Sequence, residues 1–137
     1  MSSFETLLDV PPYSLSASDK AALFAAELSR LTRSHYALCA PYKTMLNGLN
    51  IDPEKERSAA EQPYLPVRLF KEFELKSIAN DAIQKTMTSS GTSGQAVSKI
   101  YLDKSTATNQ TKVLAKIVSD LIGPKRLPML VIDARET

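Results

Sequence analysis

The residues best suited to chemistry lie in one short stretch, residues 88–95, with the sequence Thr-Ser-Ser-Gly-Thr-Ser-Gly-Gln. Five of these eight residues carry hydroxyl groups and two are glycines. Glycine permits positive φ, so successive backbone N–H groups can converge on one anion, and hydroxyls add donors without charge. Lys99 could add a cation. The pattern predicts a cradle for phosphate oxygens, although the same composition is also typical of an ordinary hairpin loop.

This loop matches neither of two common nucleotide-binding patterns. It lacks the Gly-x-x-x-x-Gly-Lys-[Ser/Thr] of a Walker loop and the Gly-x-Gly-x-x-Gly of a dinucleotide-binding turn. The one cysteine, Cys39, excludes an internal disulfide and two-cysteine metal motifs. We expect Cys39 and the one histidine, His35, to be structural residues. The patterns identify no catalytic residue and no metal ligand.

The composition is that of an ordinary globular domain. The chain has 137 residues, 43% hydrophobic and 23% charged, with a net charge of +2. Residues 85–126 hold seven basic and two acidic residues, a balance of +5, which suits an anionic small ligand or solvated helix faces. The sequence contains no recognised nucleic-acid-binding module, so we expect no nucleic-acid partner.

Targeting and membrane signals are not visible in the sequence. No apolar run approaches the roughly 20 residues that a bilayer-spanning helix needs. The first residues lack the basic stretch and apolar core of a signal peptide. We therefore expect a cytoplasmic protein without a membrane span.

The first part of the chain, residues 14–50, is predicted to be helical. Ser16 and Asp19 form a capping-box pattern. Apolar positions then recur every three or four residues, which indicates one face of an amphipathic helix: Phe24, Leu28, Leu31, His35 and Leu38. Pro41 ends this helix and begins a second one, which closes near Gly48. Residues 51–66 follow as a surface loop, and residues 63–70 are extended.

The second part, residues 80–133, must position the loop. Residues 83–88 and 99–102 are predicted strands on either side of it. A helix follows, with Asp103 as N-cap and Gly123-Pro124 as its stop. The continuous apolar run at residues 128–133 predicts a strand buried on both faces. The fold class is therefore α/β, and we expect either the N-terminal portion of a larger domain, a sheet that a partner completes, or a small complete domain.

The loop and its surroundings resemble a known family. Thr88–Gly94 resembles the phosphate-binding loop of adenylate-forming enzymes, the superfamily of acyl-CoA synthetases and firefly luciferase. Together with residues 12–15, 65–71, 98–104 and 128–133, it is similar to the LuxE acyl-protein synthetases of the bacterial luminescence fatty-acid reductase complex. The resemblance covers residues 4–133 and implies the N-terminal portion of the large domain of such an enzyme.

The resemblance implies a ligase that uses ATP and Mg²⁺. Such an enzyme activates a long-chain fatty acid as an acyl-adenylate and passes the acyl group to a protein thiol. The partners implied are the fatty acid and an acyl-accepting protein, either a reductase component or an acyl carrier protein. Seven residues would form the ATP phosphate-binding loop: Thr88, Ser89, Ser90, Gly91, Thr92, Ser93 and Gly94. Lys99 would be a further phosphate contact.

The sequence departs from the superfamily pattern in three respects. Ser93 stands where threonine is usual, and Lys99 follows Gly94 by five positions instead of lying in an early Pro-Lys pair. The later motifs for adenine, ribose and magnesium, the adenylation lysine and the acyl-accepting cysteine have no counterpart before Thr137. We do not assign the acceptor role to Cys39. We expect an incomplete, inactive fragment; the alternative is a non-catalytic, truncated module that pairs with a partner chain.

Overall fold

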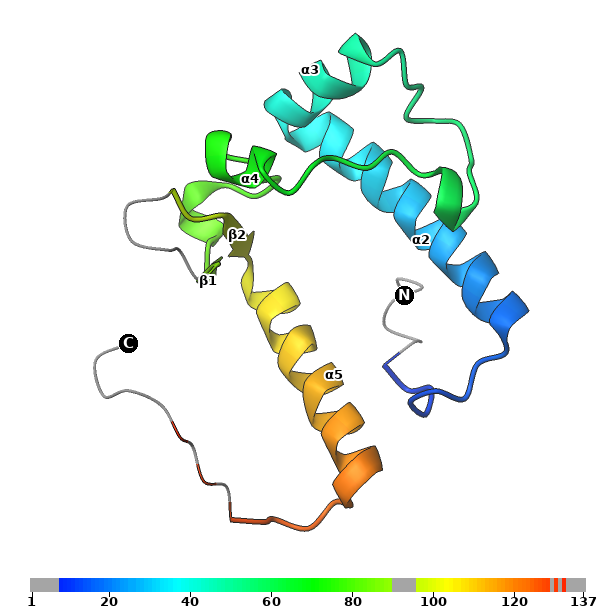
Figure 1. Cartoon of the computed structure of the whole chain (residues 1–137), viewed down its shortest axis with the longest axis vertical. Coiled ribbons are helices and arrows are strands. Elements are labelled where there is room, and N and C mark those ends of the chain that lie inside the picture. Colours follow the sequence, from blue (N-terminus) through cyan, green and yellow to red (C-terminus); the bar gives the residue numbers. More distant parts are fainter. Residues whose placement is uncertain (1–7, 90–95, 129, 131, 133–137) are drawn as a thin grey trace.

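The structure is a computed structural model that describes residues 8–89, 96–128, 130 and 132. Its elements in chain order are α2 (Ala17–Leu38), α3 (Ala40–Gly48), η1 (Ala59–Glu61), α4 (Leu69–Glu72), η2 (Asn80–Ala82), β1 (Lys85–Thr88), β2 (Lys99–Leu102) and α5 (Lys104–Ile122). Figure 1 shows the long helices α2 and α5 connected through the hairpin of β1 and β2 and the segments before it. The predicted α/β class is confirmed.

Local signals set both ends of α2. The Ser16 hydroxyl oxygen accepts a hydrogen bond from the Asp19 amide at 3.1 Å and donates to the Asp19 carboxylate at 2.7 Å. These bonds satisfy an amide that the first turn leaves free, so the predicted N-cap is confirmed. The helix ends at Leu38 because Cys39 is extended (φ −118°, ψ 99°), the usual backbone conformation of an N-cap residue, and Cys39 is the N-cap of α3.

The short helix α3 packs back against the end of α2. The Tyr36 hydroxyl donates to the Asn47 side-chain oxygen at 2.9 Å, and Leu46 is completely buried. Asn50, with φ of 54°, takes the left-handed position after the helix, and the Ile51 amide bonds the Leu46 carbonyl at 3.0 Å. This is the Schellman ending of a helix, and asparagine tolerates the left-handed conformation better than most residues.

Residues 51–66 return alongside α2 (Figure 1). They contain the short turn η1, capped by Ser58, whose backbone N–H and hydroxyl both bond the Glu61 carboxylate. Residues 63–70 are not extended throughout, because α4 begins at Leu69. Gln62 hydrogen-bonds to Ser29 and Thr32 of α2, so polar contacts attach the segment to this helix.

The hairpin of β1 and β2 is antiparallel, with Lys85 opposite Leu102 and Thr88 opposite Lys99. Asp103 caps α5, since its carboxylate accepts from the Thr106 amide at 2.7 Å. Gly123 ends α5 with φ of 84°, a left-handed value that glycine adopts without strain. The predicted cap and stop of this helix are confirmed.

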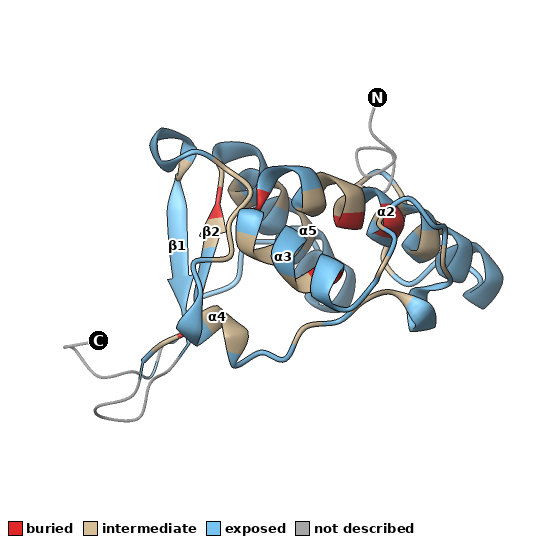
Figure 2. Cartoon of the chain, turned by 90° about the horizontal axis from the view of Figure 1, so that it is seen from above, coloured by how far each residue is buried: buried red, intermediate tan, exposed pale blue. Residues whose placement is uncertain are grey.

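Little of the described chain is deeply buried. Figure 2 shows buried residues as short segments on α2, α3 and β2, whereas β1 is exposed throughout. The apolar face expected on α2 is largely open, with Phe24 50% and Leu38 63% exposed. No helix in the described residues is long and apolar enough to cross a bilayer.

The predicted buried strand at residues 128–133 is wrong for its described residues. Pro128, Leu130 and Ile132 lie in no strand, and Leu130 and Ile132 are 85% and 91% exposed. The β1–β2 pair is the only sheet among the described residues, so none of these three residues forms a third strand. An apolar run reports a tendency to be buried, and burial also needs a layer to pack against.

Candidate functional site

The base of the predicted phosphate loop is closed by two hydrogen bonds beyond the last strand pair. The Ser89 amide donates to the Ser98 carbonyl at 3.1 Å, and the Ser98 amide donates to the Ser89 hydroxyl oxygen at 3.0 Å. The two bonds extend the hairpin by one residue on each strand. They fix the points where the loop leaves β1 and returns to β2.

Two of the predicted loop residues lie on the described hairpin. Thr88 is the last residue of β1, Ser89 follows it, and both are exposed. The other five lie outside the described residues: Ser90, Gly91, Thr92, Ser93 and Gly94. Because the Ser89 oxygen accepts the Ser98 amide, Ser89 has a structural task that the sequence did not reveal. Its own O–H hydrogen remains a donor.

Ser98 carries the one buried side-chain oxygen in the described chain that has no hydrogen-bond partner. The residue is 8% exposed and lies at the returning end of the loop. Leaving a buried hydroxyl unpaired costs about 1–3 kcal/mol. The sequence gives no signal for this residue, because a serine beside a serine-rich loop is unremarkable by composition.

Lys99 lines a pocket of about 230 Å³ with α4 and Tyr101. The pKa of Glu74 in this pocket is lowered, chiefly because Lys76 donates a hydrogen bond to its carboxylate at 2.8 Å. The positive charge of Lys99 lowers that pKa further. The predicted contact between Lys99 and phosphate stays a prediction.

A family model matches almost the whole chain. The model described as acyl-protein synthetase, LuxE, matches residues 2–137 of the chain. The chain belongs to the LuxE acyl-protein synthetase family. No curated protein and no solved structure matches it significantly. The LuxE match includes the whole hairpin and the loop between its strands.

The groups at the loop base of this LuxE chain fit a phosphate. Thr88 and Ser89 present hydroxyl groups and carry no negative charge, and both are accessible to solvent. A hydroxyl donor next to Lys99, which pairs with Thr88 across the strands, is suited to a phosphate oxygen. Within residues 8–89, 96–128, 130 and 132, no cluster of three or more His, Cys, Asp or Glu side chains could hold a metal ion.

A second hollow, which the sequence did not indicate, lies where the α2–α3 junction meets β2. It has a volume of about 500 Å³, and both His35 and Cys39 line it. The His35 Nδ1 atom and the Ser77 hydroxyl oxygen are 2.6 Å apart. Partial burial of the ring lowers the pKa of His35, and the charge of Arg30 lowers it further, so the neutral imidazole is favoured. The two residues of this pair are 42 positions apart in the chain, which is why no sequence pattern predicts it.

Proposed function

We propose that the chain provides the nucleotide phosphate-binding part of an acyl-protein synthetase that activates a long-chain fatty acid with ATP and Mg²⁺. The product would be an acyl-adenylate, whose acyl group passes to a thiol of an acyl-accepting protein. The observation that carries the proposal is the LuxE match over residues 2–137, which includes a serine-, threonine- and glycine-rich loop between two paired strands.

The proposal assigns positioning tasks to this chain's own residues. Thr88 and Ser89 would donate hydroxyl hydrogens to phosphate oxygens, and the Ser89–Ser98 bonds would hold the loop ends at a fixed separation. ATP, when bound, supplies the adenylyl group that activates a carboxylate. Transfer reactions of this kind depend on positioning and on donors placed where charge develops.

We further propose that the 137 residues do not catalyse adenylation by themselves. The LuxE resemblance identifies adenine, ribose and magnesium contacts in later motifs, which have no counterpart here. The small buried core of the described residues is consistent with a dependence on additional polypeptide. We expect the isolated chain to bind triphosphates weakly and to show no pyrophosphate exchange with fatty acids.

The test is a titration followed by the backbone amide signals of Thr88, Ser89 and Ser98 in NMR spectra. Inorganic triphosphate and Mg²⁺-ATP should both shift these signals, whereas AMP should not, because the loop is proposed to hold the β- and γ-phosphates. Equal shifts with AMP, or none with triphosphate, would contradict the proposal.

Glycine variants sharpen this titration. Gly91→Ala and Gly94→Ala should weaken triphosphate binding by about tenfold, because a methyl group restricts the backbone that the cradle needs. Gly48→Ala is the matched control, since a Cβ atom at Gly48 meets nothing within 4 Å. Binding that is the same in all three variants would refute the assignment of the loop.

A second candidate function is a non-catalytic module that pairs with another chain. The exposed apolar side chains of α5 favour it, including Leu114 (61% exposed) and Leu121 (86% exposed). This candidate predicts association without any effect of triphosphate. The same NMR titration therefore separates the two functions.

A further inference from the structure

The hollow at the α2–α3 junction has mainly apolar walls from six parts of the chain. They come from α2, α3, residues 63–65, α4, β2 and the segment at residues 75–78, with the start of α5 at one side. Leu31, Leu65, Phe70 and Leu102 are among the lining side chains. A volume of about 500 Å³ lies within the range of small-molecule sites, which are mostly apolar with a few converging polar groups.

When His35 is neutral, the His35–Ser77 pair leaves one neutral donor in either tautomer. If the Ser77 hydroxyl donates to His35 Nδ1, the other ring nitrogen of neutral His35 carries a hydrogen. If Nδ1 carries the hydrogen and donates to Ser77, the Ser77 O–H hydrogen is left over. Either tautomer therefore offers one N–H or O–H donor to a ligand oxygen.

The charges in the hollow disfavour an anionic ligand. Lys76 is the one cation among the described lining residues, and its ammonium group already bonds the Glu74 carboxylate at 2.8 Å and the Asn80 side chain. Asp103 is the one lining carboxylate. It accepts the Thr106 amide at 2.7 Å and has no ion-pair partner among the described residues. An added carboxylate would meet this negative charge without a free cation to balance it.

We propose that this hollow binds an acyl chain in its neutral, esterified form and discriminates against the free fatty acid. The carbonyl oxygen would accept the spare donor of the His35–Ser77 pair, and the chain would pack against Leu31, Leu65 and Phe70. The choice of an acyl chain rests on the proposed function; the preference for a neutral head group rests on the charges of the hollow. The site would thus hold the acyl group once it has left the anionic adenylate as a neutral thioester, and would not hold the free acid.

The test displaces the neutral fluorescent probe N-phenyl-1-naphthylamine at pH 8. Methyl decanoate should displace it at a lower concentration than decanoate does. An ester is also more apolar than a carboxylate, so a difference in the native chain alone is not decisive. The decisive quantity is the displacing concentration of decanoate divided by that of methyl decanoate, compared between variants. Asp103→Asn keeps an N-cap residue while removing the charge, so this ratio should fall by about tenfold. Asp120→Asn, the same change elsewhere on α5, should leave the ratio unchanged.

The position of the ligand is tested by filling the hollow. Leu65→Trp should abolish probe binding, whereas Val67→Trp, at a 73% exposed position outside the hollow, should retain it. Absence of probe binding to the native chain, or full binding to a folded Leu65→Trp variant, would overturn the location. An unchanged ratio in Asp103→Asn would overturn the neutral preference, even if Leu65→Trp failed to fold.

None of these measurements contains a nucleotide, so they do not depend on the phosphate loop. Probe binding with the expected ratios, together with no response to triphosphate, would retain the acyl site and reject the nucleotide proposal. A response to triphosphate without probe binding would reject the acyl site alone.

Discussion

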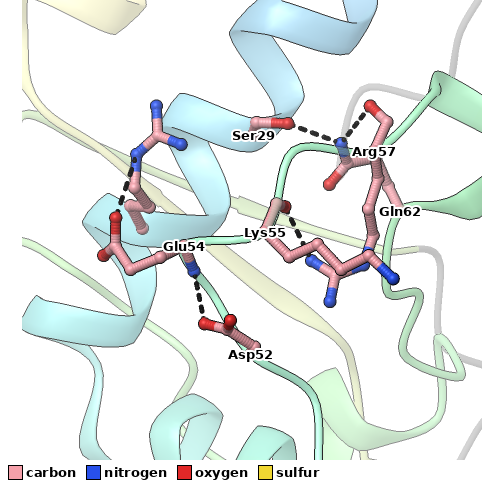
Figure 3. Close-up of polar contacts among 7 residues, drawn as sticks. Ser29, Asp52, Glu54, Lys55, Arg57 and Gln62 are labelled. Atoms are coloured by element: carbon pink, nitrogen blue, oxygen red, sulfur yellow. Dashed lines mark hydrogen bonds and ion pairs between the residues drawn. The ribbon is translucent and has the colours of Figure 1, made fainter.

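At the scale of single residues, Gln62 links the returning segment to α2. Its amide nitrogen donates to the Ser29 hydroxyl at 2.8 Å and to the Arg57 carbonyl at 3.1 Å (Figure 3). Its side-chain oxygen faces the Thr32 hydroxyl at 3.4 Å. Ser29 and Thr32 are buried, so one side chain satisfies two groups that water does not readily reach.

Gln62→Ala should therefore lower the free energy of unfolding by about 1–3 kcal/mol, because it leaves buried hydroxyls without partners. Urea unfolding at neutral pH measures this. Gln84→Ala, at an exposed position, is the control and should stay within about 0.5 kcal/mol of the native chain. Equal losses in the two variants would contradict the role given to Gln62.

His35 makes stability depend on pH. Its folded pKa is lowered by burial and by Arg30, so the unfolded chain binds the proton more readily than the folded chain does. The contribution of neutral His35 to folding stability is fully present above the unfolded pKa of 6.5. It is lost as the pH falls below that value through the lower folded pKa. We expect the melting temperature to drop between pH 7.5 and 5.5.

His35→Gln should flatten that drop, because His35 is the one histidine of the chain. The pKa values of Glu61, Glu74 and Asp103 are also lowered, chiefly by hydrogen bonds, and those groups act at more acidic pH. A pH profile of melting temperature that is identical in native chain and variant would show that His35 is not the titrating group.

At the scale of elements, the N-cap of α5 can be tested separately from its charge. Asp103→Ala should lower the free energy of unfolding by about 1 kcal/mol, whereas Asp103→Asn should lower it by a few tenths, since asparagine caps nearly as well. Hydrogen bonds from the Thr106 backbone and side chain lower the pKa of Asp103. The contribution of the Asp103 carboxylate to folding stability is therefore present above its unfolded pKa of 3.8. It is lost as the pH falls through the lower folded pKa.

Urea unfolding of the two Asp103 variants gives these values. Asp120→Ala, on the same helix but without a capping role, should be within about 0.5 kcal/mol of the native chain. A loss in Asp103→Asn as large as that in Asp103→Ala would mean that charge, not capping, holds the start of α5.

The elements that sequence predicts well are those with local causes. Ser16, Asp103 and Gly123 act through atoms within four residues, so their effects can be inferred from spacing alone. The left-handed Asn50 was missed because Gly48 offers a competing local ending. The strands on either side of the predicted loop are confirmed, and the phosphate role of the loop stays a prediction. The His35–Ser77 pair and the buried Ser98 hydroxyl depend on tertiary packing, which local sequence does not show.

At the scale of the whole molecule, α5 leaves an apolar stripe open. Leu114, Val118 and Leu121 recur at intervals of four and three, and they are 61%, 42% and 86% exposed. On a helical projection, Lys112 and Lys116 lie on the opposite side from Leu114. No charge is therefore placed within the stripe to oppose contact between two identical helices.

The stripe predicts that the chain pairs with a second copy through α5 as its concentration rises. Val118 between Leu114 and Leu121 matches the β-branched and leucine alternation that favours two-stranded packing, but the seam is short and the association should be weak. Sedimentation velocity over a hundredfold range of concentration, on the order of micromolar to sub-millimolar, should show a rising average mass. Leu114→Gln combined with Leu121→Gln should keep the chain monomeric, while Lys112→Gln combined with Lys116→Gln should not. A native chain that stays monomeric at every concentration would contradict self-association through α5. If both double variants lose self-association equally, the contact between the copies does not depend on the leucine stripe.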